Sequence, residues 1–264
     1  MATEIHPSAF VSPQAEVGEG VVVGPCAVIE EHVVIGDGTK IDAFASVKKF
    51  TRVGKNNHIH SYAAVGGVPQ DLKFHGEESY LEIGDNNSIR EFATLHRGTE
   101  DGGYKTVIGS NNLLMAYTHV AHDCILGDGI IMSNNATLAG HVQVADNAII
   151  AGLSAVHQFV RIGKHAFVGG MTGISQDLPP YMLALGNRAG VHGPNLVGLR
   201  RVKASREAIR ALKNAFKLIW HSSTPRKEGL EQLEYEFGNF PEVIEFVEFV
   251  RQSDRGILPA LKGE

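Results

Sequence analysis

The sequence predicts a mostly β fold: a parallel β-helix of hexapeptide repeats over residues 1–190, followed by an α-helical domain over residues 191–264. Pairs of an aliphatic residue and a glycine recur from Val17-Gly18 to Val168-Gly169, and most intervals between them are multiples of six. With six positions per face and three faces per turn, three hexads make one coil of the helix. After about residue 187 the hexads stop and apolar residues recur at helical spacing.

The aliphatic residue of each hexad is expected to point into the prism and to stack on its equivalent one coil away, about 4.8 Å along the axis. Each coil then covers the hydrophobic layer of the next coil. The corners must bend sharply. Residues that follow several of the glycines, such as Asn86 and Asn111, tolerate the turn and left-handed conformations that such corners need.

Two intervals break the period and predict insertions near residues 67–80 and 97–106. One runs from Val53 to Ile83 and the other from Ile83 to Ile108, and both are longer than a coil of three hexads. Loops that leave an otherwise strict solenoid often lie on one face and bind a ligand. The alternative is that both loops are tolerated surface insertions.

Three helices are expected in the C-terminal part. Ser205 can cap the first, and Pro225 and Pro241 mark the starts of two more, because proline suits the first helical position. One side of the first helix is apolar and comprises Ile209, Leu212, Phe216, Ile219 and Trp220.

Composition excludes several classes of protein. With 264 residues, of which 43% are hydrophobic, the chain is long enough to fold, and its net charge of −5 argues against a nucleic-acid binder. The N-terminus lacks a secretory signal pattern and no window is apolar enough for a membrane span, so we expect a cytosolic protein. Cys26 and Cys124 have no metal-binding spacing, and both are expected to be small core residues.

Polar residues fall into register in the middle of the chain. Gly140 lies three hexads, and thus one coil, after His122, and Gln158 lies one coil after Gly140. His141 lies one coil after Asp123. If the second insertion loops out about eight residues, His96 falls one coil before His122. Because buried polar groups are costly unless paired, such a column along one edge points to a site, although a ladder of surface histidines is the alternative.

A metal site is the rival interpretation of these histidines. The γ-class carbonic anhydrases bind zinc through three histidines on a β-helix, two of them separated by four residues. In this chain His119 and His122 are separated by two residues, so that feature is absent. We therefore assign no metal ligands, although zinc would need only three or four well-placed donors.

Several motifs carry a resemblance to a known family. They are residues 119–124, 134–142 and 155–159, together with Gln70–Lys73, His96–Thr99, Gln176–Tyr181 and Gly186-Asn187. In these motifs the chain resembles the UDP-N-acetylglucosamine acyltransferase family, over nearly its whole length and including both insertions and the helical tail. The resemblance implies left-handed coiling of the β-helix, which runs against the usual right-handed crossover rule.

The resemblance implies transfer of an (R)-3-hydroxyacyl chain from acyl carrier protein to the 3-hydroxyl of UDP-N-acetylglucosamine, the first step of lipid A biosynthesis, without cofactor or metal. A sugar hydroxyl needs a general base to attack a thioester, and an imidazole suits that task. By the match, His122 is the base, Asp123 orients it, and the backbone N–H of Gly140 faces the oxyanion. A homotrimer is expected, since family members form the site between neighbouring prisms.

The resemblance also implies a set of substrate-binding residues. The sugar and acyl sites are expected to include Gln70, Asp71, Lys73, His96, His119, His141, His157 and Gln158. For the nucleotide end, Asn195 and Arg201 are matched to uridine or phosphate contacts. Because Val197 and Val202 depart from the family pattern, Arg188 or Arg200 is expected to share the diphosphate.

Two further features bear on the acyl donor. Residues 188–217 hold eight basic side chains and only Glu207 as an acid, so this stretch is expected to dock the acidic acyl carrier protein, a solvated helix face being the alternative. Gly170 lies where bulk would block the far end of an acyl groove, which suggests a long chain, unless Gly169 and Gly170 serve backbone geometry.

Other functions stay open at this point. One is a β-helix acyltransferase acting on a 3-amino or other nucleotide sugar, because His122 would serve a nitrogen acceptor equally well. Another is a zinc-dependent β-helix hydratase. The third is a non-catalytic β-helix module of an assembly, which predicts no exposed cluster of histidines.

Overall fold

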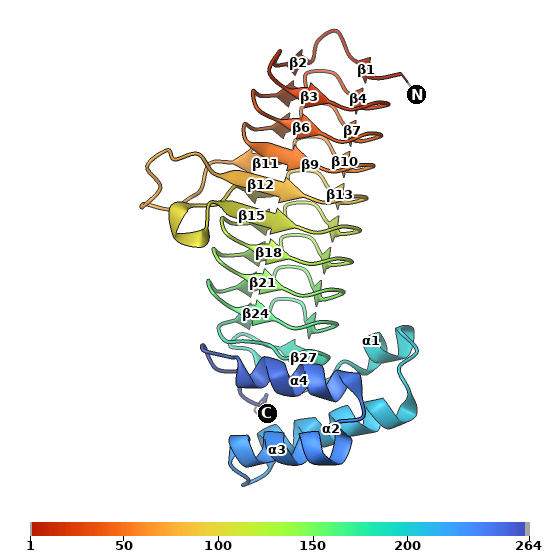
Figure 1. The fold of residues 1–264 in the computed structure, drawn as a ribbon, viewed down its shortest axis with the longest axis vertical. Coiled ribbons are helices and arrows are strands. Elements are labelled where there is room, and N and C mark those ends of the chain that lie inside the picture. Colours follow the sequence, from red (N-terminus) through yellow and green to blue (C-terminus); the bar gives the residue numbers. More distant parts are fainter. Residues whose placement is uncertain (1, 262–264) are drawn as a thin grey trace.

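Most strands are only two residues long, and they stack into three sheets, parallel except for β28, that form the faces of a prism. The computed structural model describes residues 2–261 and runs from the N-terminal coils to a group of helices at the opposite end (Figure 1). The first sheet comprises β1 (Glu4–Ile5), β4 (Val22–Val23), β7 (Lys40–Ile41), β10 (His58–Ile59), β13 (Ser88–Ile89), β16 (Leu113–Leu114), β19 (Ile131–Met132), β22 (Ile149–Ile150), β25 (Phe167–Val168), β27 (Met182–Leu185) and β28 (Gly190–Pro194).

The other two faces are built in the same way. The second sheet comprises β2 (Phe10–Val11), β5 (Val28–Ile29), β8 (Ser46–Val47), β11 (Ala64–Gly67), β14 (Thr94–His96), β17 (His119–Val120), β20 (Thr137–Leu138), β23 (Ala155–Val156) and β26 (Gly173–Ile174). The third sheet comprises β3 (Glu16–Val17), β6 (Val34–Ile35), β9 (Thr51–Val53), β12 (Tyr80–Ile83), β15 (Lys105–Ile108), β18 (Ile125–Leu126), β21 (Gln143–Val144) and β24 (Arg161–Ile162).

The pairing register confirms the predicted period and both of its interruptions. Leu126 pairs with Val144, which pairs with Ile162, and each step is one coil of three hexads. Ile83 pairs with both Val53 and Ile108, across the two longer intervals. The extra residues form loops on the same side of the prism, one between β11 and β12 and one between β14 and β15 that contains the short helix η1 (Glu100–Gly102) (Figure 1).

Buried aliphatic side chains fill the interior of the prism, and hydrogen-bonded asparagine side chains form a ladder inside one corner. Hexad residues such as Ile35, Ile83 and Leu126 are at most 5% exposed. At the corner, Asn87 Nδ2 donates to Asn57 Oδ1 at 3.0 Å, and Asn87 Oδ1 accepts from the Asn112 backbone N at 2.9 Å. Because each buried amide is paired with the next coil, the ladder avoids the cost of unsatisfied polar groups.

Aromatic side chains also occupy left-handed corner positions, for which the sequence prediction named only turn-tolerant residues such as Asn86 and Asn111. Tyr62 and Phe92 have φ values of 64° and 60°. Their rings stack at 5.0 Å, and Phe44 and Tyr117 extend the stack on either side. The geometry requires one left-handed residue at each corner, and stacking between coils stabilises the bulky side chains there.

The two cysteines lie in different environments. Cys124 is fully buried in the core, and burial raises the pKa of its thiol to about 12. Cys26 is exposed at a corner with a φ of 56°. The prediction of a core position was therefore right for Cys124 and wrong for Cys26, because the corner register, and not residue size, decides which position points outward.

The described residues after β28 form four α-helices, one more than predicted. They are α1 (Leu196–Arg201), α2 (Arg206–His221), α3 (Arg226–Phe237) and α4 (Pro241–Arg251). Ser205 caps α2 as predicted, its hydroxyl accepting from the Ala208 N at 3.0 Å. The sequence analysis missed α1 because its six residues are too short to show a period.

The hexad region passes into the helical region without a gap. β27 and β28 form an antiparallel hairpin, and residues near the C-terminus return to it through a bridge between Ala260 and Val191. The expected division after residue 190 falls within β28, so a division into two independent folding units stays a prediction. Within residues 2–261, each helix is too short or too polar to cross a bilayer.

Candidate active site

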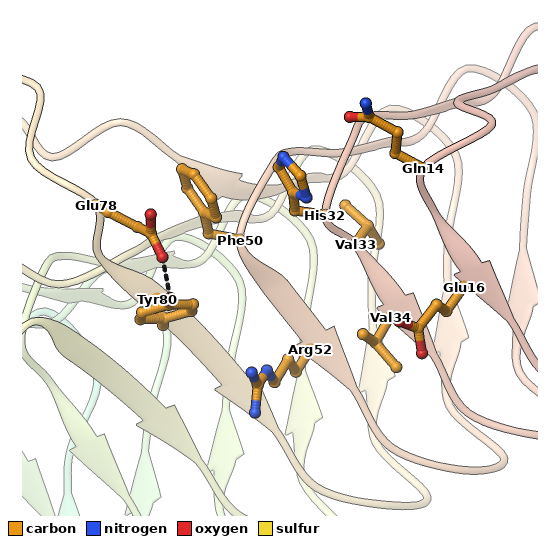
Figure 2. A pocket seen from close by; sticks show the side chains of 9 residues that line it. All are labelled: Gln14, Glu16, His32, Val33, Val34, Phe50, Arg52, Glu78 and Tyr80. Atoms are coloured by element: carbon orange, nitrogen blue, oxygen red, sulfur yellow. Dashed lines mark hydrogen bonds between the residues drawn. The ribbon is translucent and has the colours of Figure 1, made fainter.

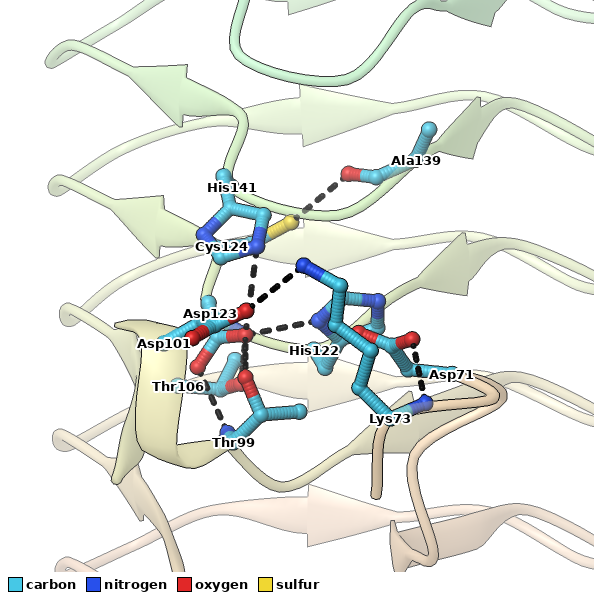
Figure 3. Close-up of polar contacts among 10 residues, drawn as sticks. All are labelled: Asp71, Lys73, Thr99, Asp101, Thr106, His122, Asp123, Cys124, Ala139 and His141. Carbon is cyan, nitrogen blue, oxygen red and sulfur yellow. Dashed lines mark hydrogen bonds and ion pairs between the residues drawn. The ribbon is translucent and has the colours of Figure 1, made fainter. Parts of the chain in front are cut away.

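The predicted base lies at the corner between the second and third sheets. His122 and Asp123 connect β17 to β18, and Asp123 adopts the left-handed corner conformation with φ of 61°. His122 Nδ1 lies 2.6 Å from Asp123 Oδ2 (Figure 3). The imidazole is partly exposed, whereas the carboxylate is almost completely buried. The corner thus holds a histidine and an aspartate in direct contact, with the imidazole facing solvent.

The second insertion fixes the aspartate. The Thr99 backbone N donates to Asp123 Oδ1 at 2.7 Å, and the Thr99 hydroxyl donates to Oδ2 at 2.6 Å. Burial alone would raise the pKa of Asp123, but the hydrogen bonds from His122 and Thr99 and the nearby His141 outweigh burial and lower it. An ionised carboxylate here keeps the proton of His122 on Nδ1 and leaves Nε2 free to accept another.

A glycine one coil away makes room for the imidazole. A Cβ placed on Gly140 would lie 2.6 Å from His122 Cε1 and 2.8 Å from Nε2. Any side chain at this position would therefore displace the ring. Among the hydrogen bonds found for residues 2–261, none uses the N–H of Gly140 as donor, so this group is available to a ligand.

His141 closes the site on the coil after Asp123. Its Nε2 lies 3.6 Å from Asp123 Oδ2, and its ring stacks on Phe159 at 4.4 Å. Burial lowers the pKa of His141, although the nearby negative charge of Asp123 acts to raise it. His141 and Phe159 line a hollow that also includes Asp123 and residues near the end of α4.

His96 and His119 lie on the face of the second sheet next to this corner. Burial, with some repulsion from His119 and His122, lowers the pKa of His96 to about 4. Burial, then His122, also lowers the pKa of His119, whose Nδ1 lies 2.7 Å from the Thr94 hydroxyl. Both rings are therefore neutral near pH 7, and His96 Nδ1 has no partner within the described chain.

The expected position of His96 was wrong by one residue. Leu95 pairs with Val120, which places His96 one coil before Ala121 and not before His122. The second insertion is therefore one residue shorter than the sequence analysis assumed. The rings of His96 and His119 are still 4.9 Å apart, so His96 remains beside the column.

The first insertion reaches the same corner. Lys73 Nζ lies 2.9 Å from Asp101 Oδ2, so the two insertions are joined by an ion pair (Figure 3). Asp71 Oδ1 accepts from the Lys73 backbone N at 3.0 Å, and Gln70 beside it is exposed. The structure thus brings Asp71 and Lys73 to the candidate base from a distant part of the sequence.

Other predicted residues lie outside this cluster within one chain. His157 and Gln158 are exposed, and His157 Nδ1 lies 2.9 Å from the Arg255 guanidinium. Arg188 and His157 line a separate groove on the second sheet. Asn195 caps α1, which contains the exposed Arg200 and Arg201 and lies on the far side of the prism from η1 (Figure 1). Gly170 lies between β25 and β26, at the corner between the first and second sheets.

Sequence reasoning missed the residues that hold Asp123. Thr99 donates twice to its carboxylate, and the Asp123 N donates to the Thr106 hydroxyl at 2.7 Å. Gly102 packs so closely that an added Cβ would lie 2.0 Å from Asp123 Cγ. Thr99 was within a motif already singled out, but only the fold shows that it reaches Asp123.

A second hollow lies among the N-terminal coils of the third sheet (Figure 2). Tyr80 donates a hydrogen bond to Glu78, and the Arg52 guanidinium lies over the Tyr80 ring at 5.6 Å. Of the described residues that line it, none was predicted as a site residue. We assign it no role in catalysis.

Comparisons with known proteins identify the family of the chain. A family model described as UDP N-acetylglucosamine O-acyltransferase, domain 2, matches residues 177–258, and a model of the bacterial transferase hexapeptide matches residues 32–67 and 105–140. Curated acyl-[acyl-carrier-protein]--UDP-N-acetylglucosamine O-acyltransferases from Aliarcobacter butzleri and Burkholderia orbicola are each 50% identical, over 96% and 97% of this chain and 97% and 99% of theirs.

The chain belongs to the UDP-N-acetylglucosamine O-acyltransferase family. Among solved structures, LpxA from Acinetobacter baumannii is 44% identical and that from Bacteroides fragilis 42% identical. Each superposes with a TM-score of 0.94 and covers 96% of this chain and 99% of its own. The family and the left-handed parallel β-helix with C-terminal helices, both predicted from the sequence, are confirmed.

The geometry of the candidate active site depends on the absence of a side chain at Gly140. Gly140→Ala should lower kcat by about 100-fold or more, because the methyl group would push the His122 ring away from its productive position. Steady-state kinetics with acyl carrier protein and UDP-N-acetylglucosamine would measure this. Gly229→Ala in α3, where an added Cβ meets nothing closer than 3.4 Å, is the matched control. Equal kcat values for the two variants would contradict the steric argument.

The desolvated His96 predicts a pH-dependent stability. Its folded pKa of about 4 lies below the ordinary 6.5, so the unfolded chain binds the proton first as the pH falls. The free energy of unfolding should therefore decrease between pH 6.5 and pH 4, by about 1–3 kcal/mol for this residue. Urea unfolding of wild type and His96→Gln across this range would measure it. A decrease of the same size in both proteins would contradict the assignment.

Proposed function

We propose that this protein transfers an (R)-3-hydroxyacyl chain from acyl carrier protein to the 3-hydroxyl of UDP-N-acetylglucosamine, the first step of lipid A biosynthesis. The observation that carries the proposal is the His122–Asp123 pair, held by the second insertion and facing the vacant side of Gly140. The relatives named above carry the name of this O-acyltransferase activity. These names favour a hydroxyl acceptor over a 3-amino sugar, and acyl transfer over a zinc-dependent hydratase.

In the proposed mechanism, His122 Nε2 accepts the proton of the sugar hydroxyl as the hydroxyl oxygen attacks the thioester carbonyl. Asp123, ionised and buried, stabilises the imidazolium that forms. The Gly140 N–H donates to the oxyanion of the tetrahedral intermediate. When the intermediate collapses, the carbon–sulfur bond breaks and the leaving thiolate takes the proton from His122. No metal or cofactor takes part in these steps.

The remaining substrate contacts are proposed to come from more than one chain. Helix α1, which Asn195 caps and which contains Arg200 and Arg201, lies on the opposite side of the prism from the insertion loops that reach His122 (Figure 1). A homotrimer with sites between neighbours would bring them together. An outward apolar row on the first sheet supports such packing; it comprises Leu113, Ile131, Ile149 and Phe167.

The acyl end of the site is proposed to accept a long chain. A Cβ on Gly170 would meet nothing closer than the Gly152 carbonyl oxygen, at 3.6 Å, so the corner there is open. Its φ does not require glycine, unlike that of Gly186 at 94°. A missing side chain at an exposed, unstrained position is consistent with space kept for a ligand. The cytosolic location expected from the sequence stays a prediction.

The carrier protein is proposed to dock on α2. Arg210, Lys213 and Lys217 line one groove of this helix together with Phe216 and His221. Arg206, in the first turn of α2, is exposed beside them. A basic face of this kind would attract an acidic partner and orient it, with an effect that weakens as salt screens the charges.

The first test of the reaction is acyl transfer from a panel of (R)-3-hydroxyacyl carrier proteins to UDP-N-acetylglucosamine, in the presence of a metal chelator. Wild type and a His32→Ala control should be active, whereas His122→Ala should lose on the order of 1,000-fold in kcat through loss of the base. Transfer that disappears with chelator would favour a metal enzyme. Product formation that survives in His122→Ala would remove the proposed base.

The docking proposal is tested by reversing the charge of Arg206 and Arg210 to glutamate. The KM for acyl carrier protein should rise by on the order of tenfold at low salt with little change in kcat, because rim charges act mainly on association. Arg226→Glu with Lys227→Glu on α3 makes the same change in net charge and serves as the control. A KM that rises equally in both double variants, or in neither, would rule out a specific docking face.

A further inference from the structure

Three potential metal ligands converge on the first sheet, away from the His122 corner. Asp42 follows β7, His58 is in β10 on the adjacent coil, and His60 follows β10. Lys40 pairs with His58, so the register brings the aspartate to the two histidines. The donor atoms of these three side chains all lie within 4.8 Å of one another. The family resemblance assigned no function to them, and the proposed reaction uses none of them.

The distances from the two histidines to Asp42 are close to those between neighbouring ligands of a tetrahedral metal ion. His58 Nε2 lies 2.9 Å from Asp42 Oδ2, and His60 Nδ1 lies 3.5 Å from the same oxygen. A tetrahedral ion with ligands at about 2.0–2.1 Å separates neighbouring donors by about 3.3–3.4 Å. The observed separations bracket this value. Small rotations of the side chains would therefore place one nitrogen of each histidine and one carboxylate oxygen around a single ion.

The arrangement is unusual for histidines that serve only as surface residues. The rings of His58 and His60 lie face to face, with centroids 3.8 Å apart and planes inclined by 25°. Protonation of both would place two positive charges at this distance, and only Asp42 and the more distant Glu91 would offset them. Neutral rings with lone pairs directed at a shared ion would instead be compatible with the stacking.

The neighbouring charges leave the site open to a cation. Glu91 Oε1 lies 3.9 Å from His60 Nδ1 but is held by Arg90, which donates to both of its carboxylate oxygens. A water molecule would therefore fill the fourth position unless Glu91 exchanges partners.

We propose that Asp42, His58 and His60 form a binding site for one divalent transition-metal ion of the zinc type. Two imidazole nitrogens and one carboxylate oxygen are donors that such ions prefer. The ion would link β7 to β10 across two coils and so stabilise the N-terminal half of the prism. This site departs from the sequence analysis, which assigned no metal ligands. It does not depend on the proposed acyl transfer.

The alternative site for an added ion is the catalytic corner, where His122, Asp123 and His141 also cluster. There, Asp123 Oδ2 already accepts from His122 and from the Thr99 hydroxyl. At the new site Asp42 Oδ2 contacts only the two histidines named, among the hydrogen bonds and ion pairs of residues 2–261. A test must therefore separate the two clusters.

Calorimetric titration of the full-length protein with Zn²⁺ in a non-chelating buffer provides that test. Wild type, His122→Ala and the control His32→Ala should each bind one equivalent per chain, and Zn²⁺ should raise their melting temperatures. His58→Ala and His60→Ala should weaken this binding by about 100-fold or more and lose the rise in melting temperature, while keeping acyltransferase activity, which reports correct folding.

Two results would overturn the proposal. One is a wild-type protein that binds no more Zn²⁺ than His58→Ala. The other is an equivalent that is lost in His122→Ala and retained in His58→Ala, because the ion would then be at the catalytic corner. Asp42→Asn adds a graded check, since an amide oxygen is a poorer zinc ligand and should give an intermediate affinity.

Discussion

The parallel register between successive coils is the constraint on which the rest of the structure depends. Each coil donates backbone hydrogen bonds to the next, and a shift of one residue would turn every inward aliphatic side chain outward. The same register sets the columns at the corners. His122, Gly140 and Gln158 form one of these columns, and Asp123, His141 and Phe159 form another. The alignment of the candidate catalytic residues is therefore a consequence of the same pairing that fills the core.

Burial at this corner separates the titratable groups by role. Desolvation opposes charge on His96, His119 and His141 alike, and their pKa values are lowered. The Asp123 carboxylate is almost completely buried, yet it keeps its charge because it accepts three hydrogen bonds from Thr99 and His122. The Asp123 backbone N also donates to the Thr106 hydroxyl, which fixes the position of the residue. The buried negative charge of Asp123 contacts His122 directly, and this contact distinguishes His122 from the neighbouring neutral histidines as the proposed base.

The sequence was sufficient for the period, the two interruptions, the cap at Ser205 and the alignment of Gly140 with His122, because each follows from spacing along the chain. It was insufficient for contacts that cross an irregular segment. The position of His96 depended on the length of the second insertion, and Thr99 reaches Asp123 only through the path of that loop. The stack of Tyr62 on Phe92 likewise crosses the first insertion. Asp42 and His60, in contrast, lie one coil apart, so the spacing that aligned Gly140 with His122 could also have found this pair.

The loop from residue 97 to 104 has a consequence for how this protein can evolve. Deleting its extra residues would restore a regular coil and improve the repeat, yet it would also take away Thr99 and Gly102, which brace Asp123 on two sides. A regular repeat and a correctly held base therefore place opposite requirements on the length of this loop. The one irregular coil that braces Asp123 thus sets a limit on how regular this β-helix can be while it still holds the base.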